Sequence, residues 1–456
     1  MTTYSAVVTT GIYCRPGCGA KPLAKNVLTF ELAAAAEAAG FRACHRCRPY
    51  RVAGPVGSDT PELVCHAVQM IINGALDDGG TETELAARIG MSQRHLRRLF
   101  LRHLGASPDQ LARSRRAHFA RRLLDDTDLT ALDIAFASGF GSLRQFNRAM
   151  REVFRASPTD LRRHRHRADR LAADGGLTLR LPVLPGYDWD TIRTFLGVRA
   201  VPGVESVEGD TYRRTIVIGG APGLLEVSPG GTGYLLLRAH LPYWEGLIHV
   251  VDRVGRLLGI DADPAAGVTA LRADPVLGVV ADKHPGLVVP GSWSLFETGV
   301  QAVIADRRSG SADRLRALVM GLGVPVPGLP GGLTHAFPNA AAVTVENLEP
   351  LGITGPDAQT VAALASGLGP GDGDGGSVET QLAEMTAEVR TYLAFRLGDR
   401  SAFPLADPSL REALADIGLS ARADGPIVDQ LTEPWRPWLA LAAMHLIARG
   451  DELLLA

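Results

Sequence analysis

The sequence is poor in cysteine and contains no long uninterrupted hydrophobic run. Only 5 of its 456 residues are cysteine, which excludes a scaffold held together by disulfide bonds. No run approaches the roughly 18 apolar residues that a membrane helix needs, and the N-terminus lacks the basic and apolar segments of a secretion signal. We therefore expect a cytoplasmic protein without a membrane partner. A chain of this length exceeds one ordinary core, so several domains are expected.

The net charge is only −2, but the two signs of charge are unevenly distributed. Residues 1–170 contain 26 Lys and Arg against 16 Asp and Glu, whereas the remainder contains 21 against 33. A basic leading region suggests a polyanionic partner, because each neutralised phosphate releases counterions. The acidic remainder does not suggest one.

Hydrophobic periodicity divides the chain into segments of different structure. Residues 1–57 are rich in turn formers, and 61–163 have a helical pattern throughout. Short β-branched or apolar segments separated by Gly, Pro and Asp predict strands at 177–184, 213–219, 223–227 and 233–241. Helical periodicity returns from residue 244, interrupted by a flexible Gly-rich connector at 367–377.

Four cysteines lie in two close pairs, Cys14 and Cys18, then Cys44 and Cys47. Two such pairs on turns suit tetrahedral Zn²⁺, because each pair spans one edge of the tetrahedron. The alternative to a reactive centre is a structural zinc that stabilises a region too small for its own core. Cys65 stands alone in an apolar helical stretch, which predicts a buried side chain.

The sequence around these cysteines resembles the N-terminal domain of the Ada family of methylphosphotriester repair proteins. The similar segments are Val8-Thr-Thr-Gly-Ile-Tyr-Cys14 and Ala39-Gly-Phe-Arg42-Ala-Cys44-His-Arg-Cys47. The resemblance implies that Cys14 accepts a methyl group from a DNA phosphotriester, with the other three cysteines as its co-ligands. It also places DNA contacts at Thr10, Lys21 and Arg42.

This chemistry is reasonable because zinc keeps thiols ionised and the thiolate is the nucleophile. Methylation of one ligand raises the formal charge of the centre from about −2 to about −1. We expect weaker repulsion of the phosphate backbone, and hence tighter DNA binding, after methylation.

Two helix-turn-helix patterns follow in tandem. In each, a helix is followed by a Gly turn, a Ser N-cap at Ser92 or Ser142, and a second helix with an apolar face. The outward residues, which we expect to contact DNA, are Gln93, Arg94, Arg97, Arg98, Arg144, Gln145, Asn147 and Arg148. Arg and Gln on such a helix can bind base edges and phosphates in the major groove, although one amphipathic pair alone is commonly plain bundle packing. The tandem resembles the DNA-binding domain of the AraC family, which implies a promoter-binding activator with RNA polymerase as a possible partner.

The rest of the chain resembles the AlkA family of 3-methyladenine DNA glycosylases. The similar segments include Tyr187-Asp-Trp189, Leu287-Val-Val-Pro-Gly291-Ser-Trp and Trp435-Arg-Pro-Trp438. The resemblance implies that a flipped base enters an aromatic pocket and that Asp407 supports cleavage of the glycosidic bond. An Asp in a loop is more commonly a turn or cap residue. The candidate pocket aromatics are Tyr187, Trp189, Tyr392 and Trp435, each of which could equally pack in a core.

This region departs from the AlkA pattern in the family's phosphate-binding hairpin. Where the family has glycines that let backbone N–H groups approach a phosphate, this chain has Leu382-Ala-Glu384-Met385-Thr386. The family's pocket tryptophan aligns with Glu388, and its Gly-Gln-Gln-like segment is replaced at 305–309. The chain also lacks the Pro-Cys-His-Arg-Val signature of the alkylguanine acceptor domain.

Together these resemblances imply a multidomain α+β protein with four parts. They are a small zinc-binding domain at 1–57, an all-α tandem helix-turn-helix domain at 58–168, a small β-sheet domain at 177–290, and a helical helix-hairpin-helix glycosylase-like domain at 291–456.

The main expectation is a Zn²⁺-dependent methyl acceptor that repairs double-stranded DNA, activates promoters and excises alkylated bases. The first alternative is a methylation-sensing transcription regulator with an inactive glycosylase-like module. The second is a DNA-binding scaffold with a structural zinc.

Overall fold

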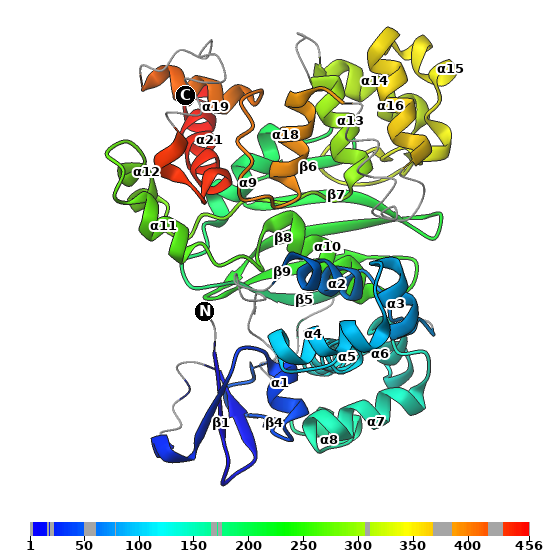
Figure 1. The fold of residues 1–456 in the computed structure, drawn as a ribbon. Helices are drawn as coiled ribbons and strands as arrows, with labels where there is room; N and C mark the ends of the chain where they lie inside the picture. Colours follow the sequence, from blue (N-terminus) through cyan, green and yellow to red (C-terminus); the bar gives the residue numbers. More distant parts are fainter. Residues whose placement is uncertain are drawn as a thin grey trace. The chain divides into compact units, whose positions relative to one another are not determined.

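The computed structural model describes residues 3–15, 18, 22–49, 61–77, 79–165, 171, 176–305, 311–367, 385–417 and 432–455. The chain forms two compact units (Figure 1). The first comprises Met1–Val183 with Tyr243–Arg253, and the second comprises Leu184–Pro242 with Val254–Ala456.

The N-terminal module of the first unit is a four-stranded sheet with one helix. Its elements are β1 (Tyr4–Val7), β2 (Ile12–Cys14), η1 (Ala24–Asn26), β3 (Val27–Phe30), α1 (Ala33–Ala38) and β4 (Arg42–Ala43). The strand order is β3-β1-β2-β4, and β4 runs parallel to β2. The sequence indicated turns here but no sheet, because these strands are too short to show an alternating pattern.

The helical pattern predicted for residues 61–163 is confirmed by the helices that the structure describes there. They are α2 (Glu62–Ile72), α3 (Glu82–Arg88), α4 (Gln93–Leu104), α5 (Pro108–Asp126), α6 (Ala131–Ala137), α7 (Leu143–Phe154) and α8 (Pro158–Arg163). The Ser92 hydroxyl accepts a hydrogen bond from the His95 N–H, and the Ser142 hydroxyl accepts one from the Gln145 N–H. These bonds confirm the predicted N-caps of α4 and α7. The turns before them contain Gly90 and Gly139 at φ of 71° and 76°, a conformation that favours glycine.

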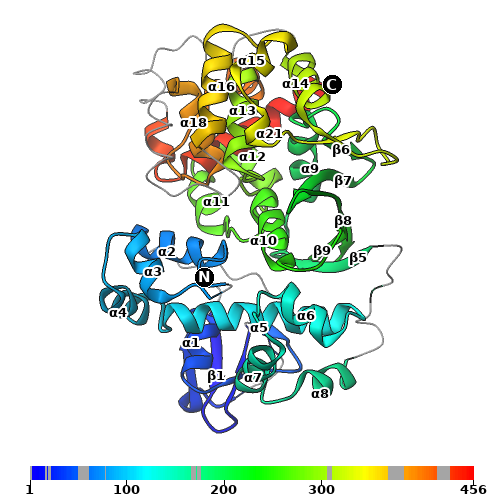
Figure 2. The same cartoon turned by 90° about the vertical axis from the view of Figure 1, so that its right-hand side faces the viewer.

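Helix α5 runs through this helical domain, and α1 and α7 both contact it (Figure 2). The predicted apolar faces of α4 and α7 are confirmed, since Phe100 and Phe146 are fully buried. The prediction for Cys65 was wrong, because its side chain is exposed. Val64 and Val68 of α2 pack into the core. Cys65 follows Val64 on this helix and therefore points about 100° away from it, towards solvent.

The first unit also contains β5 (Leu177–Pro182), which contacts α5. Arg180 of β5 donates to Asp126 over 2.7 Å. Asp126 is itself buried, so this ion pair fixes the strand to the C-terminal end of α5.

The second unit contains antiparallel strands in the order β9-β8-β7-β6. Their bounds are β6 (Glu205–Glu208), β7 (Thr211–Ile218), β8 (Ala221–Gly231) and β9 (Tyr234–His240). The structure confirms the three strands predicted here, whereas β6 was not predicted. Helix α9 (Trp189–Val198) packs against β6 and β7.

Most of the remaining described chain is helical. The elements are α10 (Leu247–Leu258), α11 (Ala265–Leu271), α12 (Leu277–Lys283), α13 (Leu295–Ala305), α14 (Ser311–Leu322), β10 (Val324–Pro325), β11 (His335–Ala336), η4 (Ala340–Ala342), α15 (Val345–Leu348), η5 (Glu349–Leu351), α16 (Gly355–Gly367), α18 (Ala387–Arg396), α19 (Pro408–Asp416), η6 (Glu433–Trp435) and α21 (Leu439–Leu455). Helices α16 and α18 both pack against α13 around one apolar core. Most of the predicted connector and the residue Glu384 lie outside the described residues.

A buried ion pair joins β7 to α13. Arg214 is 1% exposed and donates to both carboxylate oxygens of Glu297 over 2.9 Å. Burial raises the pKa of Glu297, and the adjacent Arg214 guanidinium partly offsets this increase. Because α13 also contributes to the pocket described below, this pair fixes one wall of that pocket to the sheet.

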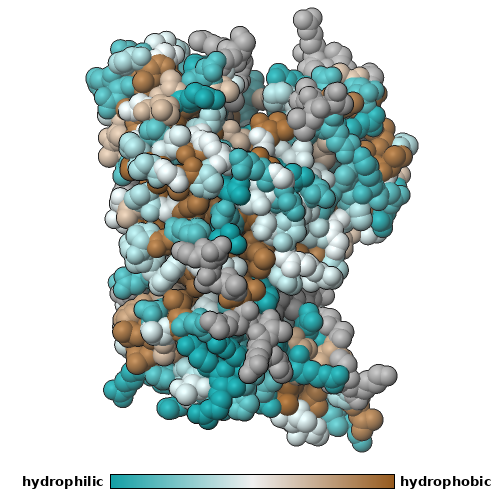
Figure 3. Space-filling model, turned by 180° about the vertical axis from the view of Figure 1, so that it is seen from behind, coloured by the Kyte–Doolittle hydropathy of each residue, from teal (hydrophilic) through white to brown (hydrophobic). Residues whose placement is uncertain are grey.

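The face drawn in Figure 3 is mostly hydrophilic, with hydrophobic side chains in small groups between polar ones. Within the described residues, none of the helices combines the length and hydrophobicity that crossing a membrane requires.

His445 of α21 predicts a pH-dependent stability. Its side chain is fully buried, and neither ring nitrogen has a hydrogen-bond partner among the described residues. Burial, and then the neighbouring His284, lowers its pKa from 6.5 to about 4, with Asp188 opposing the shift. An unfolded chain takes up this proton more readily, so the associated stability is present above pH 6.5 and is lost as the pH falls towards 4.

We expect the His445→Leu variant to lose about 3 kcal/mol less stability than wild type between pH 6.5 and 4. Urea denaturation followed by tryptophan fluorescence measures this difference, and protonation of the groups that both proteins share affects the two alike. Parallel stability curves for the two proteins would contradict the prediction.

Candidate functional site

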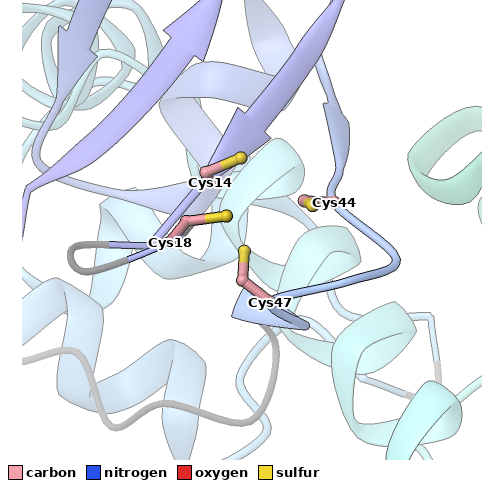
Figure 4. Close-up of side chains that lie close together, drawn as sticks. All are labelled: Cys14, Cys18, Cys44 and Cys47. Atoms are coloured by element: carbon pink, nitrogen blue, oxygen red, sulfur yellow. The ribbon is translucent and has the colours of Figure 1, made fainter. Parts of the chain in front are cut away.

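The two predicted cysteine pairs meet in space (Figure 4). The four sulfur atoms of Cys14, Cys18, Cys44 and Cys47 all lie within 4.8 Å of one another. Cys14 is 7% exposed, and the other three are half-buried. Within the described residues, this is the one group of three or more metal-ligating side chains found this close together.

The pairing of β2 with β4 brings the cysteines together. Cys14 is the last residue of β2, and Cys44 directly follows β4. The Cys44 N–H donates to the Tyr13 carbonyl over 3.0 Å, so the backbone of Tyr13 links the two cysteine pairs. The Cys44 carbonyl in turn accepts from the Arg48 N–H over 3.0 Å, which closes the turn that carries Cys47.

The cluster fits Zn²⁺. A tetrahedral zinc with Zn–S bonds of about 2.3 Å separates its sulfur ligands by about 3.8 Å, which four sulfur atoms that all lie within 4.8 Å of one another can accommodate. Burial raises the pKa of Cys14 well above its usual value and that of Cys47 to about 11. A bound metal outweighs this effect, because a coordinating thiol is deprotonated. The chain therefore has a four-cysteine Zn²⁺ site.

A buried polar cluster lies behind β2, which we call the acceptor strand because it ends at the predicted methyl acceptor Cys14. Tyr13 is fully buried, and its hydroxyl donates to Glu37 Oε1 of α1 over 2.7 Å. His118 Nε2 of α5 lies 2.6 Å from the same oxygen and 3.2 Å from the Tyr13 hydroxyl. A carboxylate only accepts, so His118 Nε2 donates to Glu37. Sequence reasoning missed Glu37 and His118, because these residues lie far from Tyr13 in the chain and belong to no local motif.

The predicted DNA contacts of this module differ in exposure. Thr10 lies exposed in the turn between β1 and β2. Arg42 is half-buried in β4 and donates to the Ala43 carbonyl over 3.1 Å. Lys21 lies outside the described residues.

The residues predicted to contact DNA on α4 all lie on its exposed face. They are Gln93, Arg94, Arg97 and Arg98. Two of them also interact with Glu82 of α3, since Arg97 pairs with its carboxylate over 3.7 Å and Gln93 donates to it over 3.4 Å. These long contacts leave the side chains at the surface, where they can exchange partners with DNA.

On α7, Arg144, Gln145 and Arg148 are exposed, as predicted from the pattern. Asn147 is half-buried, and its amide donates to the Leu143 carbonyl over 2.9 Å, within its own helix. Arg148 pairs with the exposed Glu152 over 3.7 Å, a contact that costs little to break.

In the second unit, Asp407 and Tyr392 line one pocket of about 270 Å³. Helices α9, α13, α14, α18 and α19 contribute to its lining, either directly or through residues next to them. The polar residues of the lining are Arg199, Gln301, Ser311, Glu388, Tyr392, Asp407 and Ser409. Sequence reasoning had not singled out Arg199 or Gln301 as site residues.

Asp407 is 4% exposed and held by several partners. Arg199 Nη2 donates to its two oxygens over 2.9 and 3.0 Å. The same guanidinium donates to Asp451 over 3.0 Å, and burial raises the pKa of that second carboxyl. Asp407 also accepts from the Ser409 and Leu410 N–H groups as the N-cap of α19. Asp407 is therefore both an N-cap residue, as expected of an Asp in a loop, and a residue of the pocket.

The other candidate aromatics lie away from this lining. Tyr187 lines a different pocket and donates to the Leu258 carbonyl over 2.6 Å. Trp189 is buried and donates to the Asp210 carbonyl over 3.0 Å. Trp435 packs against Phe403 with ring centroids 5.9 Å apart and donates to Asp274 over 2.8 Å. The structure thus brings Tyr392 to Asp407 and gives the other three rings packing partners elsewhere.

Three family models match the chain in successive segments. The metal binding domain of Ada matches residues 2–50, a helix-turn-helix domain matches 85–164, and the AlkA N-terminal domain matches 178–294. The chain is similar in fold to a 3-methyladenine DNA glycosylase from Archaeoglobus fulgidus. That match has a TM-score of 0.51 at 18% identity and covers 61% of this chain and 99% of the other.

Some similar proteins match one part of this chain, and another matches nearly all of it. The DNA-3-methyladenine glycosylase 2 of Escherichia coli is 25% identical over 58% of this chain and 94% of its own. The bifunctional transcriptional activator/DNA repair enzyme Ada of the same species is 36% identical over 26% of this chain and 32% of its own. A probable bifunctional transcriptional activator/DNA repair enzyme AlkA of Mycobacterium tuberculosis is 37% identical over 97% of this chain and 91% of its own. This chain, which carries a zinc site, paired helix-turn-helix units and a glycosylase-like fold, belongs to the family of bifunctional transcriptional activator/DNA repair enzymes of the AlkA type.

Proposed function

We propose that this chain repairs alkylated DNA and activates transcription in response to methylation of Cys14. The observation that carries the proposal is the four-cysteine cluster, with Cys14 on a strand end, ahead of two exposed basic helices in one compact unit. DNA is the partner of the helix-turn-helix units, and RNA polymerase is the partner through which a bound activator would act.

The methyl transfer is a direct displacement. The Cys14 thiolate attacks the methyl carbon of a DNA methylphosphotriester, a C–S bond forms, and the bond between that carbon and the ester oxygen breaks, while the oxygen stays on phosphorus. The restored phosphodiester leaves with the negative charge, so the balance needs no further reactant. Bound Zn²⁺ supplies four ionised thiols at neutral pH. The protein holds Cys14 at the end of β2, where the strand pairing fixes its direction.

Methylation also changes how the module interacts with DNA. The formal charge of the metal centre rises from about −2 to about −1, next to a backbone that is a dense line of negative charge. Arg42 and the exposed arginines of α4 and α7 then attract phosphates against less opposing charge. A repaired lesion is thereby converted into tighter promoter binding.

The pocket of the second unit fits base excision. A flipped base would enter beside Tyr392, and the Asp407 carboxylate would stabilise positive charge developing on the sugar. Arg199 and the α19 N-terminus hold this carboxylate in place. We propose Asp407 as the catalytic carboxylate and Tyr392 as the aromatic wall.

One observation favours a second candidate function. Glu388 lines the same pocket, and the sequence resemblance aligns it with the pocket tryptophan of the AlkA family. An acidic side chain there removes a stacking surface, and the second half of the chain is acidic overall. The second candidate is a methylation-sensing regulator whose glycosylase-like unit is folded but inactive.

Replacing the acceptor thiolate tests the first activity. We expect Cys14→Ser to abolish methyl uptake from methylated DNA, because a serine hydroxyl stays protonated and is a poor nucleophile. Mass spectrometry of intact protein measures the added methyl group. Cys65→Ser, at the exposed cysteine outside the cluster, is the matched control and should take up methyl as wild type does. Undiminished uptake by Cys14→Ser would assign the acceptor elsewhere.

Arg148 tests the role of α7. We expect Arg148→Ala to weaken duplex binding and to reduce the salt dependence of binding by about one counterion, because one phosphate contact is lost. Fluorescence anisotropy at several salt concentrations measures the slope. Arg272→Ala, at an exposed arginine of the second unit, is the control. Equal slopes for Arg148→Ala and wild type would exclude the contact.

Asp407 tests the glycosylase. We expect Asp407→Asn to lower release of 3-methyladenine by at least about 100-fold, because an amide cannot stabilise developing positive charge as a carboxylate does. Arg199 keeps Asp451 as a partner, so the fold should survive, and circular dichroism checks this. Asp282→Asn, at an exposed surface ion pair, is the control. No release by wild type, with methyl uptake intact, would establish the regulator alternative.

A further inference from the structure

The acceptor strand is tied to the second helix-turn-helix unit by a chain of contacts within the first unit. Tyr13 precedes Cys14 on β2, and its hydroxyl and His118 Nε2 both donate to Glu37 Oε1. These three side chains are at most 16% exposed, and we call them the Tyr13–Glu37–His118 cluster. Glu37 Oε2 is also buried and has no hydrogen-bond partner among the described residues.

The far side of His118 faces the predicted DNA-recognition helix. Its ring packs against Phe154, the last residue of α7, with ring centroids 5.7 Å apart. Phe154 is 1% exposed, so α7 cannot shift along its axis without disturbing this contact. One imidazole therefore touches both the carboxylate behind Cys14 and the end of the helix that carries Arg144 and Arg148.

Two further contacts join the same parts. Strand β4, which leads into Cys44, contacts α7 directly. Arg48, which follows Cys47, lies 4.0 Å from the fully buried Asp125 of α5. Both cysteines of the second pair are thus flanked by residues held against α5 or α7.

We propose that His118 is a positioning residue that couples the methylation state of Cys14 to the placement of α7 on DNA. This inference rests on the proposed methyl-acceptor function. The backbone of Tyr13 spans both cysteine pairs, so an adjustment of the zinc centre on methylation reaches β2 and β4 together. The Tyr13–Glu37–His118 cluster passes that adjustment to α5 and α7, because close-packed interiors transmit small shifts.

The test compares DNA affinity before and after methylation in full-length protein. Wild type, His118→Leu and the control His66→Leu are each measured with a labelled duplex at one salt concentration, unmethylated and after incubation with methylated DNA. His66 lies exposed on α2, away from the cluster. We expect methylation to tighten binding about tenfold in wild type and His66→Leu, and only about threefold in His118→Leu, where the charge change at the metal centre remains but its transmission to α7 is lost. Methyl uptake and zinc content should stay at wild-type levels in His118→Leu.

Tyr13→Phe keeps the ring and removes only the hydroxyl that donates to Glu37. If His118→Leu does not fold, the same affinity ratio is measured in Tyr13→Phe, and we expect it to be smaller than in wild type. An unchanged tenfold ratio in the folded variants would overturn the proposal. So would an equal loss of affinity in both methylation states, because that result is what a purely structural role produces. If wild type gains a methyl group without binding more tightly, the coupling falls while the acceptor function stands. If mass spectrometry finds no methyl on Cys14 of wild type, the acceptor function falls and the coupling falls with it.

Discussion

Four thiolates can share one small volume only if a divalent cation offsets their mutual repulsion, and the N-terminal module depends on that constraint. Burial alone raises the pKa of Cys14 and would keep its thiol protonated and unreactive. Metal coordination reverses this, so the same buried position becomes both a structural ligand and a nucleophile. Folding of the module and readiness for methyl transfer therefore have one physical origin.

Buried carboxylates paired with nitrogen donors occur both beside the zinc site and around the pocket of the second unit. Glu37 accepts from His118 behind the acceptor strand, and Asp407 accepts from Arg199 in the pocket. Arg214 and Glu297 fix the helix that forms another wall of that pocket. Removing such a charge from water is costly, and the cost is offset only when the partner is held in good geometry. These pairs consequently define positions more than they add stability.

The two units differ in how their chemistry depends on neighbouring charge. The first unit has exposed arginines on α4 and α7 whose intramolecular contacts are long or exposed, which suits exchange for phosphates. In the second unit, Asp407 is enclosed by Arg199 and by the N-terminus of α19, and Glu388 lines the same pocket. For base excision, the Asp407 carboxylate would have to stabilise positive charge on the sugar while it stays hydrogen-bonded to Arg199. Asp451 helps to hold Arg199 in place, because it accepts from the same guanidinium.

The features that the sequence determined by itself are local ones. The cysteine spacing specified the metal site, and the Ser caps, Gly turns and apolar faces specified α4 and α7, because each involves residues within a few turns of one another. Only the tertiary structure decided which distant residues meet. It formed a sheet from strands too short to show a pattern, turned Cys65 outward, and separated Tyr392 from the other three candidate aromatics. It also placed His118 against Glu37 and Arg199 against Asp407. Periodicity reports which face of an element is apolar, whereas the partner of a buried charge is set by how whole elements pack, which no local pattern encodes.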